Sequence, residues 1–568
     1  MQKLTSLTKT RRVRLAALLR LSLMSAALAT AMAASAADVP PRPALPRDAA
    51  DPARELQRLQ QGVDRFQAEQ EVQRLRGQQE QGEVKAPSAQ VPQGANFSFV
   101  LKKVTHNPSA VLSDAEIDAI VAPYLDKKMD INALKEMLGA INARYYALGY
   151  VVCEARLKPQ RIHNGELAIT LIEGKTEAVD IKGAKHTNER WIKSHFNLKE
   201  GEVANYREMS EDLVRFNMVN DVELSIDIRA GNAPETTRYE ITAHEPDLFG
   251  VTVFGDTNGP TTTGRFRAGA SITDRSVFGI RDSLMLLVMG SMGSQSALAT
   301  YSIPLWPNGP RLSVSGSMGR VTVKNGPSAE MEVTGKSHYV NTRLDQPVYV
   351  TQHQKWTLFA QYMDQYSLTR MFDVDMNETT IRTTSAGFEG LLYGEGSVYY
   401  LTSAINHAKA SEETFQEKWQ AYTLTGNAFG KWRLSNVDTF SASANWQTHL
   451  GGDDLVSSQQ FYLGNGSGIR GYANDLISAD RGVWLNLEVE RDLGRPFPAV
   501  FAFFDTGRLW GNSVYKTKRL SSVGAGLRVP LWKNASIMGQ MAIPLNRNVD
   551  GGLAVDTVRF DASFIASW

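Results

Sequence analysis

The stretch that decides the fold is Gly466–Ser467–Gly468–Ile469–Arg470–Gly471–Tyr472, and Phe503–Phe504–Asp505–Thr506–Gly507 follows it about thirty residues later. The three glycines at 466, 468 and 471 have the spacing of a dinucleotide-binding loop. Such a loop needs a buried strand before it and a helix after it. Polar residues flank the stretch instead, at 457–460 and 474–475, and they predict loop on both sides. The stretch is therefore not a nucleotide site.

Residues 246–568, which contain both stretches, alternate between apolar and polar side chains in short segments separated by Gly, Asn and Asp. Clear examples are 312–318, 440–446 and 560–566. A soluble sandwich also alternates, but so long a region is unusual for one such domain. A lipid-embedded barrel requires strands of about ten residues, apolar outside and polar inside, because its closure pairs every backbone group. Sixteen strands would leave about 20 residues each, and the residues alone allow about 14 to 18 strands.

Two regions before the barrel, 97–173 and 177–244, each predict the element order β-α-α-β-β. In the first copy, Ser113 and Glu116 form a capping box that begins a short helix, and Gly149 ends a second helix. We expect strands at 97–104, 151–157, 167–171, 179–181, 222–228 and 239–241, and second-copy helices at 189–196 and 206–216.

Residues 1–36 have the features of an export signal: a basic start, an apolar stretch and the cleavage site Ala34–Ser35–Ala36. An N-terminal segment, 37–80, follows and contains a helix that begins at Asp51–Pro52, and a linker occupies 81–96. The apolar residues of this helix form only a narrow stripe: Leu56, Leu59, Val63 and Phe66. Two interpretations remain: a solvated helix or weak coiled coil, or a plug helix inside a wet pore.

The composition argues against several classes of protein. Six of the 61 basic residues lie in the signal, so the mature chain is acidic overall and nucleic acid is not an expected partner. Cys153 is the only cysteine, which excludes an intramolecular disulfide and predicts a small core residue in a strand. The nine histidines are scattered, and the run Gly464–Asn465–Gly466–Ser467–Gly468 is not a nucleophile elbow, because Asn465 stands two residues before Ser467, where the motif needs glycine. We expect no enzyme activity, no cofactor and no metal.

The strand at Asp505 breaks the alternation of the barrel. If Asp505 faces the lumen, Phe501 and Phe503 face it too, although a wet pore should not be lined by Phe. One account is an error in the predicted register or a strand covered on both faces. The other is that something packs there, and the loop at Arg470 is the obvious candidate.

Taken together and in this order, the two stretches resemble the Arg-Gly-Phe/Tyr loop and the F-x-D-x-G strand of outer-membrane transporters that carry polypeptide-transport-associated (POTRA) domains. The repeated unit resembles tandem POTRA domains, and residues 141–146, with 149–150, 159–160 and 165–167, are similar to the first such domain of two-partner secretion transporters. The aromatic Trp568 resembles the recognition signal of outer-membrane barrels.

This resemblance implies a transmembrane β-barrel of 16 antiparallel strands (246–568), preceded by a plug helix and two periplasmic α+β POTRA domains (97–174 and 175–245). It also implies that Arg470 of the loop meets Asp505 of the strand. The loop motif is Ile469, Arg470, Gly471 and Tyr472, with Ile where Val is usual and Tyr where Phe is common, and the strand motif is Phe503, Asp505 and Gly507.

The function that the resemblance implies is two-partner secretion, as in the haemolysin and filamentous-haemagglutinin transporters. In the outer membrane of a Gram-negative bacterium, such a transporter captures a large unfolded exoprotein (a haemolysin, an adhesin or a contact-dependent toxin) through its POTRA domains. It passes the exoprotein through the barrel, and folding outside drives export. Outer-membrane lipid and the barrel-assembly machinery are further expected partners. The main alternative is a barrel-assembly factor of the same superfamily, and a plain porin or adhesin is a third class.

Overall fold

The computed structural model describes residues 52–59, 98–413, 417–494, 497–532, 534–550, 553 and 555–568. The predicted signal, the linker 81–96 and the helix residues Val63 and Phe66 lie outside these described residues. The chain divides into two compact units. One contains the barrel and residues 52–59, and the other contains the region up to Leu248 together with Phe278–Arg281.

The first α+β domain has a three-stranded sheet of order β2-β5-β4, in which β2 and β5 are parallel. Its elements are β1 (Phe99–Val100), β2 (Lys103–His106), α3 (Asp114–Val121), η1 (Ala122–Tyr124), β3 (Lys128–Met129), α4 (Ile131–Leu148), β4 (Cys153–Leu157) and β5 (Glu166–Glu173). The expected strand 97–104 is split, because β1 pairs with β3 while β2 joins the main sheet. The switch occurs where the N–H of Leu101 donates to Lys127 and the N–H of Lys102 donates to Gly165.

The local signals for the helices of this domain are present as interactions. Ser113 and Glu116 make the reciprocal hydrogen bonds of a capping box at α3. Asp130 caps α4, and Gly149 ends it with a φ of 94°, which is left-handed backbone that favours glycine. Cys153 is buried in the domain core, as the sequence predicts.

The second α+β domain repeats this plan with the sheet order β6-β8-β7. Its elements are β6 (Lys175–Lys182), α5 (Glu189–Lys193), α6 (Tyr206–Val219), β7 (Glu223–Ala230) and β8 (Thr236–His244). The ring of His195 lies edge-on to Trp191 and to Phe216 in the core, with ring centroids 4.7 and 4.8 Å away. Burial lowers the pKa of His195 to about 4, so this histidine is a neutral core residue near pH 7.

The two α+β domains are joined by Gly174 alone, and Asn205 connects their helices. The Oδ1 atom of Asn205 accepts the N–H groups of Arg207 and Glu208 (2.9 and 3.3 Å) at the start of α6. Its Nδ2 atom donates to the carbonyl of Leu148 at the end of α4 (3.0 Å). One side chain therefore caps two helices from different domains.

The barrel is closed and has 16 antiparallel strands, which confirms the predicted fold class. Each strand pairs with its neighbour along the barrel, and β26 closes the ring against β9. The strands are β9 (Phe249–Asp256), β10 (Arg267–Asp274), β11 (Ser283–Gly290), β12 (Ser294–Pro304), β13 (Arg311–Thr322), β14 (Thr334–Thr351), β15 (Gln354–Met371), β16 (Val374–Gly394), β17 (Ser397–Glu412), β18 (Glu417–Arg433), β19 (Asp438–Gly452), β22 (Arg481–Asp492), β23 (Ala499–Trp510), β24 (Arg519–Trp532), β25 (Ala535–Pro544) and β26 (Arg559–Ser567).

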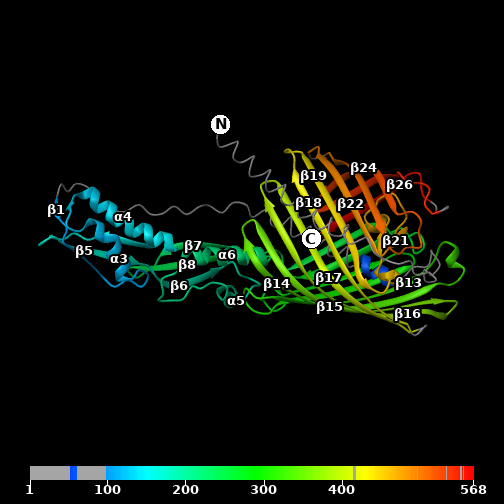
Figure 1. Cartoon of the computed structure of the whole chain (residues 1–568), viewed down its shortest axis with the longest axis horizontal. Helices are drawn as coiled ribbons and strands as arrows, with labels where there is room; N and C mark the ends of the chain where they lie inside the picture. The colour runs from blue at the N-terminus through cyan, green and yellow to red at the C-terminus, as the bar shows by residue number, and fades with distance from the viewer. Residues whose placement is uncertain are drawn as a thin grey trace. The chain divides into compact units, whose positions relative to one another are not determined.

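The barrel wall is uneven in height. Strands β9, β10 and β11 have 8 residues each, whereas β16 has 21 and its neighbours β15 and β17 have 18 and 16. Figure 1 shows the long strands in green and yellow, with the blue helical residues 52–59 among the barrel strands. Among the helices in the described ranges, none is both long and apolar enough to cross a bilayer.

Candidate functional site in the barrel lumen

The loop between β19 and β22 carries the predicted motif and folds against β23. Its two short strands, β20 (Phe461–Leu463) and β21 (Ile477–Ala479), pair as a hairpin that the sequence analysis did not predict. Arg470 lies between these strands, and Asp505 lies on β23. The structure thus brings together the two stretches that are about thirty residues apart in the sequence.

Arg470 and Asp505 form a two-pronged ion pair inside the barrel. Arg470 donates from Nε to Oδ2 of Asp505 and from Nη2 to Oδ1, both at 2.8 Å. Its backbone N–H donates to the same carboxylate at 3.1 Å. The Asp505 side chain is 0% exposed and that of Arg470 is 18% exposed, so the pair is largely removed from water. Parallel bonds from one guanidinium to one carboxylate are the geometry that makes such burial tolerable.

Further groups complete the surroundings of Arg470. Its Nη1 atom donates to Glu488 on β22 at 2.9 Å and to Gln540 on β25 at 3.5 Å. Its guanidinium carbon lies 3.5 Å from the centroid of the Phe503 ring. Phe503 therefore faces the lumen with Asp505, and the loop is what packs against it. Glu488 and Gln540 were not predicted from the sequence, where their only signal was an inward polar position on a strand.

Apolar packing holds the remainder of the loop. Ile469 and Tyr472 are both 0% exposed and belong to one buried cluster with the β20–β21 hairpin. The hydroxyl of Tyr472 donates to the carbonyl of Ser521 at 2.7 Å and accepts the N–H of Asn546 at 3.1 Å. The loop thus contacts β24 and the chain beyond β25, in addition to β23.

Two glycines of the motifs allow the close approach of loop and wall. Gly471 has a φ of 92°, a left-handed conformation. A Cβ atom on Gly507 would lie 2.5 Å from Leu463 Cδ2 and 3.2 Å from Ile469 Cδ1. The left-handed backbone at Gly471 and the lack of space for a side chain at Gly507 explain why the motifs contain glycine at these positions.

The N-terminal helix also lies in the lumen. Leu56 and Leu59 pack with Leu287, Leu298 and Tyr339 of the wall. Leu56 and Leu59 are the two residues of the predicted apolar stripe that the structure describes. They pack against apolar side chains and do not face water. The carbonyl oxygen of Pro52 accepts a hydrogen bond from the Ser337 hydroxyl at 2.8 Å.

This helix contacts the Arg470 loop directly. Arg58 donates to Oδ2 of Asp475 from Nε (3.0 Å) and from Nη2 (2.6 Å). The guanidinium carbon of Arg54 lies 4.1 Å from the centroid of the Tyr462 ring. These contacts were not predicted from the sequence, because they join residues about 400 positions apart.

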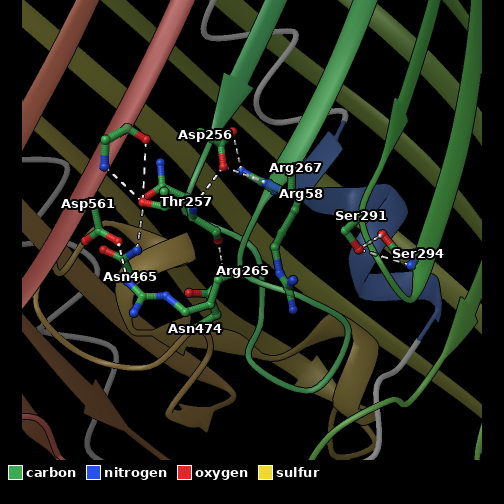
Figure 2. A network of polar contacts seen from close by, with 12 residues as sticks. Arg58, Asp256, Thr257, Arg265, Arg267, Ser291, Ser294, Asn465, Asn474 and Asp561 are labelled. Atoms are coloured by element: carbon green, nitrogen blue, oxygen red, sulfur yellow. Dashed lines mark hydrogen bonds and ion pairs between the residues drawn. The ribbon is translucent and has the colours of Figure 1, made fainter.

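The same loop reaches the closing seam of the barrel (Figure 2). Asn474 donates to the carbonyl of Asn258 at 2.6 Å, beyond the end of β9. From the turn after β9, Arg265 donates to the carbonyl of Phe560 (2.9 Å) and to Asp561 (3.3 Å), which lie on β26. Side chains therefore continue the connection of β9 and β26 past the five register pairs of their backbones.

Comparison with known proteins identifies the family. A family model described as haemolysin secretion/activation protein ShlB/FhaC/HecB matches residues 236–529, slightly more than half of the chain. A model of the ShlB-type POTRA domain matches residues 99–174. The chain belongs to this haemolysin secretion/activation family.

Similar proteins cover most of the chain. It is 24% identical over 491 residues to the heme/hemopexin transporter protein HuxB of Haemophilus influenzae, covering 82% of this chain and 86% of HuxB. It is 23% identical over 412 residues to the outer membrane transporter CdiB of Dickeya dadantii, covering 68% and 72% of the two chains. The solved structure of CdiB from Escherichia coli has a TM-score of 0.66 at 19% identity, covering 91% of this chain and 99% of CdiB.

Family membership confirms the two-partner secretion interpretation over the barrel-assembly alternative. The protein is an outer-membrane transporter of a secreted partner protein, and its POTRA domains belong on the periplasmic side. Within the described residues, no group of three or more His, Cys, Asp or Glu side chains is arranged to hold a metal ion.

Proposed function

We propose that this transporter binds an unfolded exoprotein at a free strand edge of its POTRA domains and passes it through the barrel once residues 52–59 have left the lumen. The exoprotein is a large haemolysin, adhesin or contact-dependent toxin that folds outside the cell. Its folding drives export, so the transporter carries out no chemical step of its own. The observation that carries the proposal is a strand edge on which backbone groups remain available.

One edge strand in each POTRA domain carries a capping asparagine side chain. In the first domain, Asn142 of α4 accepts the outward N–H of Ala155 on β4 at 2.6 Å. In the second, Asn217 of α6 accepts the N–H of Leu224 on β7 at 2.8 Å and donates to its carbonyl at 2.9 Å. The two domains therefore use equivalent asparagines to fix the start of an edge strand.

The later part of β7 carries no such cap. Strand alternation points the N–H and C=O groups of Ile226 and Ile228 in the same direction as those of Leu224. Within the described part of the chain no side chain bonds to them. An extended segment of the exoprotein could add here as a fourth strand, with main-chain hydrogen bonds supplying affinity.

In the lumen, the two inserts have different proposed roles. We assign the helix that contains Leu56 and Leu59, and whose stripe includes Val63 and Phe66, as the plug that leaves. The Ile469–Tyr472 motif, with Phe503, Asp505 and Gly507, is the lock that keeps the loop in place. The aromatic Trp568 at the end of β26 supports insertion by the barrel-assembly machinery, and the outer wall contacts outer-membrane lipid.

Binding by a soluble fragment tests the POTRA part of this proposal. Residues 95–245 should bind the N-terminal region of the exoprotein encoded beside the transporter with micromolar affinity, because an unfolded partner must be ordered on binding. Ile228→Pro removes the outward N–H and should weaken binding about tenfold, the effect of one lost hydrogen bond plus steric hindrance. Ile228→Ala is the matched control, since it shortens the same side chain but keeps the N–H.

Calorimetry distinguishes the outcomes of this experiment. Equal weakening by the two substitutions would reject the β7 edge as the binding site. No binding at roughly 100 μM would reject capture by these domains as a whole.

A further inference from the structure

Two pairs of stacked rings stand on the outer side of the long strands. His338 of β14 and Tyr366 of β15 are register partners whose ring centroids lie 5.0 Å apart at 27°. His407 of β17 and Tyr422 of β18 are partners at 4.5 Å and 6°. Ile405, which shares the face of His407, is 56% exposed in the apolar part of the wall. Both pairs therefore border the lipid-facing surface.

The second pair lies at the right height for the outer membrane interface. Tyr399 and Trp432, eight and ten residues away on the same two strands, form another aromatic pair, with ring centroids 5.5 Å apart. With a rise of about 3.4 Å per residue and a tilt of about 40°, the two pairs are about 21–26 Å apart along the barrel axis. Aromatic girdles flank an apolar band of about 25 Å in such barrels. Because β17 runs away from the end at which the periplasmic domains enter β9, His407 and Tyr422 mark the outer leaflet.

A pair of cations lies just beyond each His–Tyr pair. Beyond His338, Lys336 is the register partner of Arg320 on β13, and both are exposed. Beyond His407, Lys409 is the partner of Arg382 on β16, and both are exposed. The same arrangement thus occurs twice on neighbouring parts of the wall.

Like charges placed directly opposite each other on two strands repel. Arg382 is partly neutralised, since its Nε atom donates to Asp364 at 3.0 Å. For Arg320, Lys336 and Lys409, no carboxylate within the described ranges lies at ion-pair distance. Four basic groups in two facing pairs are therefore left with one carboxylate, and Arg382 and Lys409 lie just beyond the aromatic pair that marks the outer interface.

We propose that these two cation pairs bind the phosphate groups of lipid A, the anionic glycolipid of the outer leaflet, while its acyl chains lie on the apolar wall below the His–Tyr pairs. Arginine can donate two parallel bonds to one phosphate, and lysine adds a mobile charge beside it. Lys336, Arg382 and Lys409 lie on the long strands β14, β16 and β17, so lipid A would stabilise the side of the barrel where the wall is tallest.

Lipid retention by the purified full-length transporter in detergent tests this site. The probes are bisphosphorylated lipid A, monophosphorylated lipid A and phosphatidylglycerol. One variant combines Arg320→Gln with Lys336→Gln, and a second combines Arg382→Gln with Lys409→Gln. The matched control combines Arg433→Gln with Arg491→Gln, which removes two exposed basic groups at the opposite end of the barrel.

Each test variant should bind bisphosphorylated lipid A about thirtyfold more weakly than wild type, while the control binds normally. Monophosphorylated lipid A should bind wild type more weakly than the bisphosphorylated form, and phosphatidylglycerol should not distinguish the variants. Heat modifiability on gels verifies that each barrel is folded. Unchanged affinity in both test variants would overturn the proposal, as would an equal loss for phosphatidylglycerol. A change in oligomeric state with lipid A binding intact would assign the surface to a second copy of the chain instead.

Discussion

Two segments lie in the same barrel lumen, and they differ in the partners that hold them. The loop at Arg470 is held by a buried ion pair and by side chains fully enclosed in the wall. The helix of residues 52–59 rests its leucines on an apolar patch of the wall, and its Arg58 forms an ion pair with Asp475 of the loop whose side chains are 16% and 8% exposed, about as buried as Arg470. The helix also makes part of its contacts to the loop and not to the wall. In the proposed mechanism the helix leaves while the loop remains, and loss of the helix would leave the contacts of the loop with the wall intact.

Breaking the lock should have the largest effect. Arg470→Ala leaves Asp505 buried without its partner, at a cost of about 3–5 kcal/mol, which is enough to displace the loop but not to break a closed barrel. We expect a folded, heat-modifiable protein in the outer membrane that exports little or none of its exoprotein. Asp505→Ala should behave alike. Surface detection of the exoprotein measures the effect.

Two further variants make this prediction sharper. Arg491→Ala is the control, because it breaks an Arg–Asp pair of similar geometry whose arginine is 58% exposed and should cost about 0–1 kcal/mol. Exchanging the charges, with Arg470→Asp and Asp505→Arg together, should restore part of the export. Full export by Arg470→Ala alone would remove the lock from the proposed mechanism.

Releasing the plug should have an intermediate effect and leave the lock intact. Deleting residues 37–80 should increase ion conductance in planar bilayers while the barrel stays folded. The double substitution Leu56→Asp with Leu59→Asp should increase the conductance as well, because it places two charges against the apolar side chains of Leu287, Leu298 and Tyr339. Gln57→Asp, on the more accessible side of the same helix, should leave the conductance near that of wild type. Unchanged conductance in the deletion variant would contradict the plug and favour the alternative interpretation, a solvated helix.

Crowding the loop should have the smallest effect. The added methyl group of Gly507→Ala would meet the ends of Leu463 and Ile469, so side chains must shift, at a cost of about 1–3 kcal/mol. We expect slower export and a lower temperature for the heat-induced mobility shift. Gly539→Ala is the matched control on β25, where a Cβ atom meets nothing within 4 Å. Equal behaviour of the two variants would show that the loop does not depend on a close fit at Gly507.

The features that the sequence predicts are those set by local patterns. Alternation gives the strands of the barrel, and the Ser113–Glu116 box and Gly149 give helix ends that the structure confirms. The meeting of Arg470 and Asp505 was inferred from a family resemblance, together with the cost of burying an unpaired charge.

The features that were missed depend on distant partners. The strand expected at 97–104 is split because Leu101 bonds to Lys127 and Lys102 to Gly165. Glu488 is one of many inward polar residues, and only the fold of the loop selects it as a partner of Arg470. The contact of Arg58 with Asp475 has no local signal in either segment.

The bridge made by Asn205 has a consequence for the spacing of binding sites. With Gly174 as the only connecting residue and one asparagine capping α4 and α6 together, the POTRA pair has no flexible tether. Two edges on such a pair are separated by a fixed distance. An exoprotein that binds both edges would gain avidity only when the spacing of its two binding segments matches the distance between the edges. Lengthening the chain between the two segments would reduce the gain.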